Sequence, residues 1–347
     1  MKKDAETGKT AGVILAAGFG KRMLPLTSTI PKPLLPILGI PLFEITSKKL
    51  LRSGASRIHS NIHHLADHFE EFAASRDWPL TLHRETTLLG TGGGIGNMAC
   101  ELADFDTILL HNGDILSSIE YEPAIAYHAS HGALITLLLT SPSHPPDSKD
   151  QFAGTHAGTQ TRVPRRLPPP SIQITPSGEI TGIGGARSET GSHTETLGYS
   201  GIAVLSREAL DYFPQDRRID LVDILLAMIE KRPGSVMGYN TMSGDEQRFW
   251  GEAGSPEFYL DLHRRVLAEK IRFDPLLDPP LLPIHVCHDA AVDPGTRWKG
   301  FVEVGPQAVV EKDASLEDCV ILGNAVVCSG SSHCRAILYP GGIIQVE

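Results

Sequence analysis

The feature that most constrains the fold is a short apolar run followed at once by a glycine-rich, basic loop. Residues 13–17 are typical of a buried parallel strand, and Gly18 and Gly20 come directly after them. Arg22 follows, and the loop ends at Lys32 between two prolines. Glycines let backbone N–H groups approach an anion closely, and the cations add positive charge. The stretch therefore predicts a strand-end loop that binds a polyphosphate.

Two other phosphate-binding motifs do not fit the sequence. A dinucleotide fingerprint needs a third glycine where Met23 stands, and Pro25 interrupts the helix that should follow. The triplet that begins at Gly8 lacks the first glycine of a P-loop and precedes the strand instead of following it. The remaining alternative is an ordinary loop whose cations face solvent, which requires glycines, cations and prolines to coincide by chance.

The order Gly-x-Gly-x-Arg, Pro-x-Thr and Pro-Lys-Pro resembles the signature loop of the sugar-1-phosphate nucleotidylyltransferases, or NDP-sugar pyrophosphorylases. Here these motifs begin at Gly18, Pro25 and Pro31. The resemblance implies an enzyme that makes an NDP-sugar and pyrophosphate from an NTP and a sugar-1-phosphate, with Mg²⁺ as cofactor. It also implies catalytic roles for Arg22 and Lys32. The nucleotide-binding residues implied in this stretch are Leu15, Ala17, Gly18 and Gly20.

Composition excludes several other classes of protein. The 347-residue chain has a formal net charge of −10, which argues against a nucleic-acid groove or a basic membrane patch. Its first residues lack the apolar region of a signal peptide, and no run approaches the length of a spanning helix. Five cysteines without a CxxC pair are typical of a reducing compartment. We therefore expect a soluble, cytoplasmic protein with neither a nucleic-acid partner nor a membrane partner.

Apolar runs alternate with helical patterns through the first part of the chain. Strands are expected at 13–17, 57–61, 80–83, 107–110 and 133–140, and helices at 42–53, 64–75 and 123–131. A hairpin at 171–183, a strand at 197–205 and helices at 221–231 and 256–270 follow. This alternation predicts an α/β fold with a doubly wound, mostly parallel sheet, and the resemblance implies the Rossmann-like nucleotide-diphospho-sugar transferase fold. Ligands of such sheets collect at the carboxyl ends of the strands.

The composition changes at three places, and these changes predict the domain boundaries. Residues 1–273 form the expected nucleotidylyltransferase domain, in which the Pro-, Ser-, Gly- and Thr-rich segment 141–170 is a flexible insertion. Residues 274–284 form a Pro-rich connector, and 285–347 form a second domain.

The second domain repeats every six residues. One row is Val304, Val310, Leu316, Leu322, Cys328 and Cys334, and another is Ala308, Ala314, Val320 and Val326. Hexad spacing predicts a short left-handed parallel β-helix of two or three coils, with these rows, Cys328 and Cys334 included, packed inward. The alternative is an alternating sheet. The open end of a short β-helix needs a cap, either the catalytic domain or another subunit, so we expect a homo-oligomer through the β-helix.

Two carboxylates are candidate metal ligands. Asp114 follows a buried strand, where its side chain can reach a cleft or simply cap the next turn. The sequence Asn-Gly-Asp that it ends resembles the strand-end Gly-Asp of the family, which binds the metal. Glu252 stands where the late family motif Trp-x-Asp-x-Gly-Thr-Pro has Asp, and Ser255 stands in place of Thr. The resemblance implies that both acids bind Mg²⁺; the alternative for Glu252 is an acidic cap of the following helix.

A glycine-rich segment at 85–96 is the third element of the candidate site. Its glycines allow close approach to a flat base, and Glu85 or Thr91 could read base edges; the alternative is a flexible turn before a helix. The segment resembles the Leu-Gly-Thr-x-Gly loop of the family, and its wording is closest to the muramate-type uridylyltransferases. The nucleotide-binding residues implied here are Glu85, Gly90, Thr91 and Gly92.

The sugar side of the site is less well marked. The segment 198–202 is similar to the one that borders the sugar in the same subgroup, which implies sugar binding by Asn112, Tyr199, Ser200 and Gly201. An acid-Lys-Pro motif of many relatives is missing, and Arg187 is the only cation in that interval. Either Arg187 replaces the lysine, or groups such as Arg22 bind the sugar phosphate, or the enzyme is impaired.

Two functions therefore remain. The first is a nucleotidylyltransferase with UTP or GTP favoured, because the glycine-rich segment 85–96 resembles that of uridylyltransferases and the appended β-helix resembles that of mannose-1-phosphate guanylyltransferases. The second is a catalytically silent, sugar-nucleotide-binding regulatory subunit of an active homologue. The departures at Glu252 and in the acid-Lys-Pro interval favour the second function, and the intact loop motifs favour the first.

Overall fold

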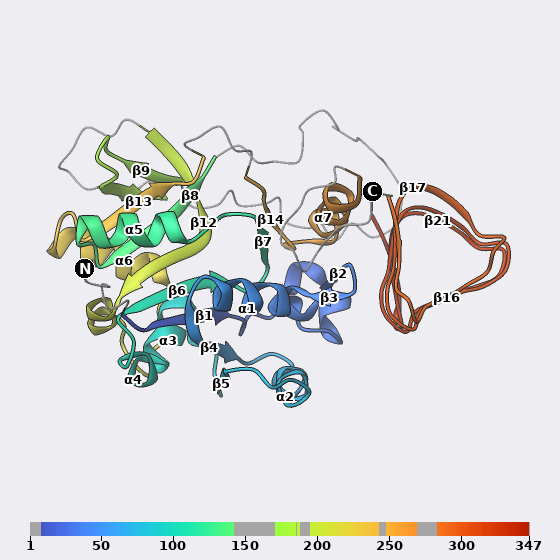
Figure 1. Cartoon of the computed structure of the whole chain (residues 1–347), viewed down its shortest axis with the longest axis horizontal. Helices are drawn as coiled ribbons and strands as arrows, with labels where there is room; N and C mark the ends of the chain where they lie inside the picture. Colours follow the sequence, from blue (N-terminus) through green and yellow to red (C-terminus); the bar gives the residue numbers. More distant parts are fainter. Residues whose placement is uncertain are drawn as a thin grey trace, which may run out of the picture.

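The computed structural model describes residues 8–141, 171–184, 186–187, 195–242, 248–268 and 283–346. An α/β domain comes first, and the last strands stack into coils with a triangular outline at the other end of the molecule (Figure 1). The predicted insertion at 142–170 and most of the predicted connector, 274–282, lie outside the described residues.

One half of the main sheet is parallel, as predicted. Its strands are β1 (Thr10–Leu15), β4 (Ala55–Ile62), β5 (Leu80–Arg84) and β6 (Thr107–Asn112), in the order β6-β1-β4-β5. The register aligns Leu15 with Asn61 on one side and with Asn112 on the other. The carboxyl ends of three strands therefore meet at one level, where ligands of such sheets bind.

The other half of the sheet is largely antiparallel, which the sequence did not indicate. It contains β8 (Ile135–Thr140), β9 (Ser171–Ile174), β10 (Ile180–Ile183), β11 (Ala186–Arg187), β12 (Glu195–Ser206) and β13 (Val236–Asn240). The long strand β12 runs antiparallel to β6, β8 and β9, and β13 runs parallel to β8. Hydrophobic patterning marks a buried strand but carries no direction, because parallel and antiparallel strands bury the same side chains.

Helices cover both faces of the sheet (Figure 1). They are α1 (Leu42–Arg52), α2 (Ala66–Ala74), α3 (Gly90–Asn97), α4 (Ala99–Leu102), α5 (Glu122–His131), α6 (Leu221–Lys231) and α7 (Pro256–Ala268). Short 3₁₀ segments are η1 (Lys21–Met23), η2 (Leu26–Ser28), η3 (Lys32–Leu34) and η4 (Arg207–Tyr212). None of the described helices is long and apolar enough to span a membrane.

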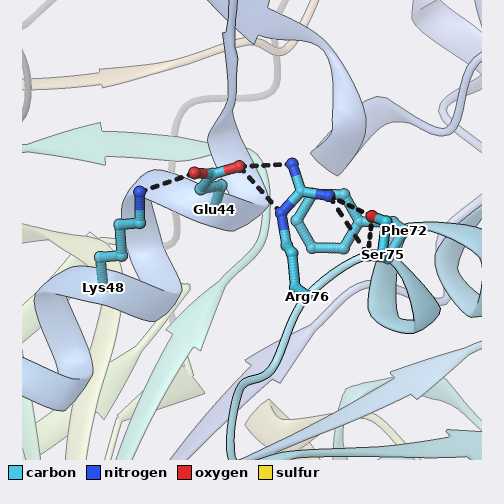
Figure 2. A network of polar contacts seen from close by, with 5 residues as sticks. All are labelled: Glu44, Lys48, Phe72, Ser75 and Arg76. Carbon is cyan, nitrogen blue, oxygen red and sulfur yellow. Dashed lines mark hydrogen bonds and ion pairs between the residues drawn. The ribbon is translucent and has the colours of Figure 1, made fainter.

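A polar network ties α1 to the end of α2 (Figure 2). Glu44 accepts hydrogen bonds from Lys48 at 2.7 Å and from Nη2 of Arg76 at 2.7 Å. The Arg76 guanidinium also lies 3.7 Å from the ring centroid of Phe72. These contacts hold the outer helix layer beside the parallel half of the sheet.

The last strands form a parallel β-helix. One sheet contains β15 (Ile284–Val286), β17 (Arg297–Val304), β19 (Ser315–Ile321), β21 (Ser332–Tyr339) and the antiparallel β22 (Gly342–Gln345), and another contains β16 (Ala291–Val292), β18 (Val309–Val310) and β20 (Val326–Val327). Val302 pairs with Cys319 and Cys319 pairs with Ala336, so these coils advance by 17 residues. The predicted stacking is present; the first coil, in which Ile284 pairs with Val302, keeps three hexads, and the later coils are one residue shorter.

The shorter coil makes part of the predicted inward rows wrong. Cys328 and Cys334 are exposed, and Val326 is 56% exposed. One residue is lost from the repeat before Ile321, so the interior position falls on Val327 instead of Cys328. The earlier members of the rows are buried, although Val320 and Leu322 pack toward the α/β domain and not into the β-helix.

The α/β domain and the β-helix share one hydrophobic cluster, which we call the shared core. Figure 1 shows α7 and the hairpin β2–β3 between the sheet and the β-helix. The hairpin consists of β2 (Pro36–Ile37) and β3 (Ile40–Pro41). The shared core includes Met23 and Leu26 of the glycine loop, Leu35 and Ile37 near the hairpin, Tyr259 and Leu262 of α7, and Phe301, Val320, Ile337 and Val346 from the last domain. The glycine loop and the β-helix are therefore joined by one hydrophobic cluster.

Candidate functional site

A cavity of about 410 Å³ opens at the carboxyl ends of β1, β4 and β6. Ten of the predicted site residues line it: Leu15, Ala17, Gly18, Gly20, Arg22, Lys32, Gly90, Thr91, Asn112 and Asp114. The structure therefore brings the glycine loop, the strand-end aspartate and the start of α3 to one pocket.

The glycine loop is held by contacts within the loop and from the next strand end. Thr27 donates its hydroxyl to the Gly20 carbonyl at 2.9 Å, and Nε2 of His64 bonds the Thr27 carbonyl at 2.7 Å. His63 stacks edge-on against Phe19, with 5.4 Å between the ring centroids. The two histidines thus support the glycine loop.

Lys32 and Asp114 form an ion pair on the floor of the pocket. The Lys32 side chain is only 11% exposed and that of Asp114 is 25% exposed. Burial alone would raise the pKa of Asp114, but the Lys32 ammonium and, more weakly, Arg22 hold this pKa below its ordinary value. Asp114 is therefore ionised at neutral pH and available as an oxygen ligand.

Glu252 lies beside Asp114 through backbone pairing. It ends β14 (Trp250–Glu252), which pairs antiparallel with β7 (Ile115–Ser117) and aligns Glu252 with Ile115. The next residue, Ala253, donates its N–H to the Asp114 carbonyl at 2.8 Å. A carboxylate oxygen of Glu252 lies 3.8 Å from Nη1 of Arg22. Both acids thus face cations of the glycine loop.

This donor set fits Mg²⁺. Two carboxylates offer the hard oxygen ligands that Mg²⁺ prefers, and phosphate oxygens and water usually complete its octahedron. Glu252 does not line the cavity itself, but its neighbour Gly254 does, and a Cβ on Gly254 would lie 2.5 Å from Glu252 Oε1. In the described ranges no group of three or more His, Cys, Asp or Glu residues could hold a metal by protein ligands alone.

One wall of the pocket, which we call the sheet wall, is formed where β1, β4 and β5 end. Asn61 accepts a hydrogen bond from the Ala16 N–H at 3.0 Å and donates to Glu85 Oε1 at 2.7 Å. Glu85 Oε2 accepts the N–H of Leu89 at 2.9 Å. Glu85 is buried and holds Asn61 and the start of α3 in place, so it supports the pocket from behind, while Thr91, the other residue expected to read base edges, lines the cavity.

The start of α3 contributes to the same wall only in part. Gly90 and Thr91 line the cavity, but Gly92 donates its N–H to the Ile219 carbonyl at 3.0 Å and lies outside the cavity lining. Gly90 has a φ of +75°, and a Cβ there would lie 2.7 Å from that carbonyl, so glycine is required. Gly92 thus packs on the segment before α6, and its contact with nucleotide stays a prediction.

The predicted sugar-binding residues of β12 lie behind the pocket. Ser200 is buried and donates its hydroxyl to the Leu138 carbonyl at 2.7 Å, and Tyr199 is half-buried, with its hydroxyl enclosed. A Cβ on Gly201 would lie 2.8 Å from Nδ2 of Asn112, so Gly201 supports the pocket-lining Asn112 from behind. The side chain of Arg187 lies outside the described residues.

Seven residues line the cavity that the sequence reasoning did not select: Ala16, Lys21, Pro33, Asn61, Leu88, Asp220 and Gly254. Three of them, Ala16, Lys21 and Pro33, flank residues that were selected. Asn61 had a usable signal, because it ends a predicted strand next to the glycine loop. Asp220 had only a weak signal, an acid before the helical pattern of α6, because its approach to Gly90 depends on a contact distant in sequence.

Comparison with known proteins agrees with this geometry. Residues 11–149, which contain the glycine loop and Asp114, match the family model described as nucleotidyl transferase. Over these residues the chain is similar to nucleotidyl transferases. The matched region holds nearly all of the cavity-lining residues and ends before Asp220 and Gly254.

Two curated relatives align with most of the chain. A mannose-1-phosphate guanylyltransferase of Mycobacterium tuberculosis is 27% identical over 340 residues, which cover 93% of this chain and 83% of that protein. A UTP–glucose-1-phosphate uridylyltransferase of Synechocystis sp. is 23% identical over 349 residues, covering 94% and 82%. At these coverages both alignments extend from the α/β domain into the β-helix.

A solved structure shows the same fold. The crystal structure of HddC from Yersinia pseudotuberculosis superposes with a TM-score of 0.52 at 20% sequence identity, covering 72% of this chain and 96% of that chain. The predicted Rossmann-like nucleotide-diphospho-sugar transferase fold is thereby confirmed.

Proposed function

We propose that this chain is a sugar-1-phosphate nucleotidylyltransferase that makes an NDP-sugar and pyrophosphate from an NTP, either UTP or GTP, and a sugar-1-phosphate. The observation that carries the proposal is that two ion pairs meet at one pocket. They are Lys32 with Asp114, which line it, and Arg22 with Glu252. In each pair the cation comes from the glycine loop and the acid from a strand region at the floor of the pocket. The names of the two curated relatives also support this proposal.

The reaction needs charge neutralisation and alignment more than it needs a protein base. The phosphate oxygen of the sugar-1-phosphate attacks the α-phosphorus, a P–O bond forms, and the bond to pyrophosphate breaks. The attacking oxygen is already ionised at neutral pH. Arg22 and Lys32 stabilise the charge that develops on the phosphate oxygens, because both side chains border the cavity. Asp114 and Glu252 would hold Mg²⁺, which supplies further electrostatic stabilisation when bound.

Two substrates would occupy opposite sides of the glycine loop. The sheet wall offers the backbone of Leu15 and Ala16, the Asn61 amide and the Thr91 loop, which suit a flat base and its ribose. Asn112, with Gly201 behind it, lies on the β6 side and would contact the sugar. Tyr199, Ser200, Glu85 and Gly92 then act by supporting the pocket, and a direct role for Arg187 stays part of the proposal.

The experiment is pyrophosphate release with Mg²⁺, crossing the four NTPs with mannose-1-phosphate, glucose-1-phosphate and N-acetylmuramate-1-phosphate. Turnover confined to one NTP and one sugar would support the proposal and identify both substrates. Each NTP is also titrated alone by calorimetry. If no combination of NTP and sugar phosphate released pyrophosphate while nucleotide binding was retained, the enzymatic function would be contradicted.

That last outcome would favour the second candidate, a silent regulatory subunit that binds a sugar nucleotide. One observation favours it: among the described residues, the cations that line the cavity, Lys21, Arg22 and Lys32, all belong to the glycine loop. None lies on the sugar side, where many relatives have a lysine.

Assembly and location complete the proposal. We expect a cytoplasmic homo-oligomer formed through the β-helix, where the exposed side chains of Val309 and Val326 stack on one face. Light scattering on the purified chain measures the oligomer directly, and a monomer at micromolar concentration would remove this part of the proposal.

A further inference from the structure

A buried carboxylate on the β-helix points toward the α/β domain. Glu303 lies on β17 between Val302 and Val304, whose side chains fill the β-helix interior. Successive strand residues face opposite sides, so Glu303 faces outward. It is nevertheless only 1% exposed, because the hairpin β2–β3 and α7 cover it.

The turn of the hairpin binds this carboxylate with two backbone amides. Leu38 donates its N–H to Glu303 Oε2 at 3.0 Å, and Gly39 donates to Oε1 at 2.9 Å. Both turn residues have positive φ, +51° for Leu38 and +74° for Gly39. Successive amides in such a turn form a concave anion site, which Glu303 fills from the other domain.

Helix α7 binds the same carboxylate. Nε2 of the fully buried His263 lies 2.8 Å from Glu303 Oε2, and Nδ1 of His263 lies 2.8 Å from the Tyr259 carbonyl, to which it donates. The Tyr259 hydroxyl in turn donates to the Pro36 carbonyl of the hairpin. Burial would raise the pKa of Glu303, but His263, His285 and the Leu38 amide hold this pKa below its ordinary value.

Both bound elements lead directly to the pocket. The hairpin follows η3, which begins with Lys32, and the N–H of Leu35 bonds the Lys32 carbonyl at 3.1 Å. Helix α7 begins at Pro256, four residues after Glu252. A shift of about 1 Å in catalytic groups can cost about a hundredfold in rate.

We propose that Glu303 is a positioning residue of the active site, which sets the hairpin that follows Lys32 and the helix that follows Glu252. The inference rests on the proposed function. It assigns to the β-helix a role in catalysis, exerted through one carboxylate and separate from any role in assembly.

The test compares Glu303→Ala with Glu303→Gln and Val320→Ala in the full chain. A Gln side chain can still accept an N–H of the turn and donate to Nε2 of neutral His263, so it should rescue most of the effect. Val320 pairs with Glu303 in the next coil and belongs to the same shared core, but it has no polar group toward the hairpin. It is the matched control for lost packing.

We expect Glu303→Ala to lower kcat about tenfold or more with a smaller change in the nucleotide KM. Hydrogen exchange of peptides covering residues 32–42 should accelerate in this variant, with no substrate or metal present. Glu303→Gln should stay within about threefold of the wild-type kcat. Val320→Ala should lower Tm but leave kcat and the exchange of these peptides near wild type.

The proposal is overturned if Glu303→Ala keeps a wild-type kcat, or if Val320→Ala loses as much kcat and hairpin protection for the same loss of Tm. A wild-type chain without turnover would refute the proposed function instead. The exchange measurement would still decide whether Glu303 fixes the hairpin, so the two failures are distinguishable.

Discussion

The two walls of the pocket are held by different forces. The sheet wall rests on three paired parallel strands and on the hydrogen bonds that join Asn61 to Ala16 and Glu85. The opposite wall, which we call the loop wall, rests on the ion pairs of Lys32 and Arg22 and on the contact between Leu38 and Glu303, 265 positions away in sequence. The sheet wall is held mostly by backbone pairing between segments that are close in sequence compared with Leu38 and Glu303. The loop wall is held by charged side chains and by that more distant contact.

This difference suggests a division of labour. Backbone-defined walls change little when one side chain is removed, so they suit recognition of a rigid nucleoside. A wall built from charged side chains can follow the charge that moves during phosphoryl transfer. We therefore expect loop-wall variants to alter mainly kcat and sheet-wall variants to alter mainly KM.

The largest effect should come from Asp114→Asn in the loop wall. It removes the counter-charge of the buried Lys32 and a proposed metal ligand, so kcat should fall about a hundredfold or more. Nucleotide binding measured by calorimetry should be retained. Asp211→Asn, an exposed acid on η4, is the control and should be inert. Unchanged turnover in Asp114→Asn would refute the assignment of this carboxylate.

A smaller, different effect is expected from Asn61→Ala in the sheet wall. The variant leaves the Ala16 N–H and one oxygen of Glu85 without their partner, which costs about 1–3 kcal/mol of stability. The nucleotide KM should rise about tenfold, which corresponds to about 1.4 kcal/mol, with kcat nearly unchanged. Steady-state kinetics beside thermal unfolding measure both. If Asn61→Ala lowered kcat without raising the nucleotide KM, the expected difference between the two walls would be contradicted.

Acid should weaken the sheet before it weakens the contact of the β-helix. Burial, with the neighbouring His83 and Arg57, lowers the pKa of His59 on β4 from 6.5 to about 4. Below pH 6.5 the unfolded chain binds a proton that the folded chain refuses, so stability present above pH 6.5 is lost toward pH 4, by up to about 3 kcal/mol. Because the pKa of Glu303 is lowered, the stability that its ionised carboxylate contributes is lost only below pH 4.5.

Urea unfolding at pH 7 and pH 5 tests this prediction. The wild type should lose more stability between the two values than His59→Gln, which cannot titrate at this position. The buried His128, whose pKa is also lowered to about 4, contributes equally to both proteins and cancels in the comparison. Equal losses in the two proteins would contradict the assignment to His59.

The smallest effect is expected outside both walls, at Glu44→Gln. The Lys48 and Arg76 hydrogen bonds and charges lower the pKa of Glu44 against the opposing effect of burial. Its partly exposed ion pairs should contribute about 1 kcal/mol or less at pH 7. This contribution is present above pH 4.5 and is lost as the pH falls through the lower folded pKa. The difference in Tm between the wild type and Glu44→Gln should be smaller at pH 3.5 than at pH 7. The kinetic constants should be the same for both proteins.

Much of the sheet wall and of the glycine loop was predictable from sequence. Strand ends can be predicted from apolar runs. A glycine or an acid at the carboxyl end of a parallel strand lies at the ligand-binding edge of the sheet. For that reason Gly18, Gly20, Lys32 and Asp114 line the cavity as expected. The helices at 221–231 and 256–268 follow equally well from their apolar periodicity.

What the sequence could not indicate depends on contacts between distant segments. Gly92 resembled a nucleotide-binding glycine, but its N–H bonds Ile219 more than a hundred residues later. The antiparallel β12 and the 17-residue coil, which exposes Cys328, follow from pairing geometry that hydrophobic periodicity does not encode. Glu303 is covered by a hairpin turn 264 positions earlier in the chain, a contact that no local pattern encodes.

The shared core has a consequence for how the protein is made on the ribosome. Met23 and Leu26 of the glycine loop pack in one cluster with Val346, which leaves the ribosome after every other member of that cluster. The sheet can assemble while synthesis continues, because domains fold as their segments emerge. The glycine loop cannot finish packing until the β-helix has been synthesised. The nascent chain therefore completes the packing of this loop only after Val346 has emerged.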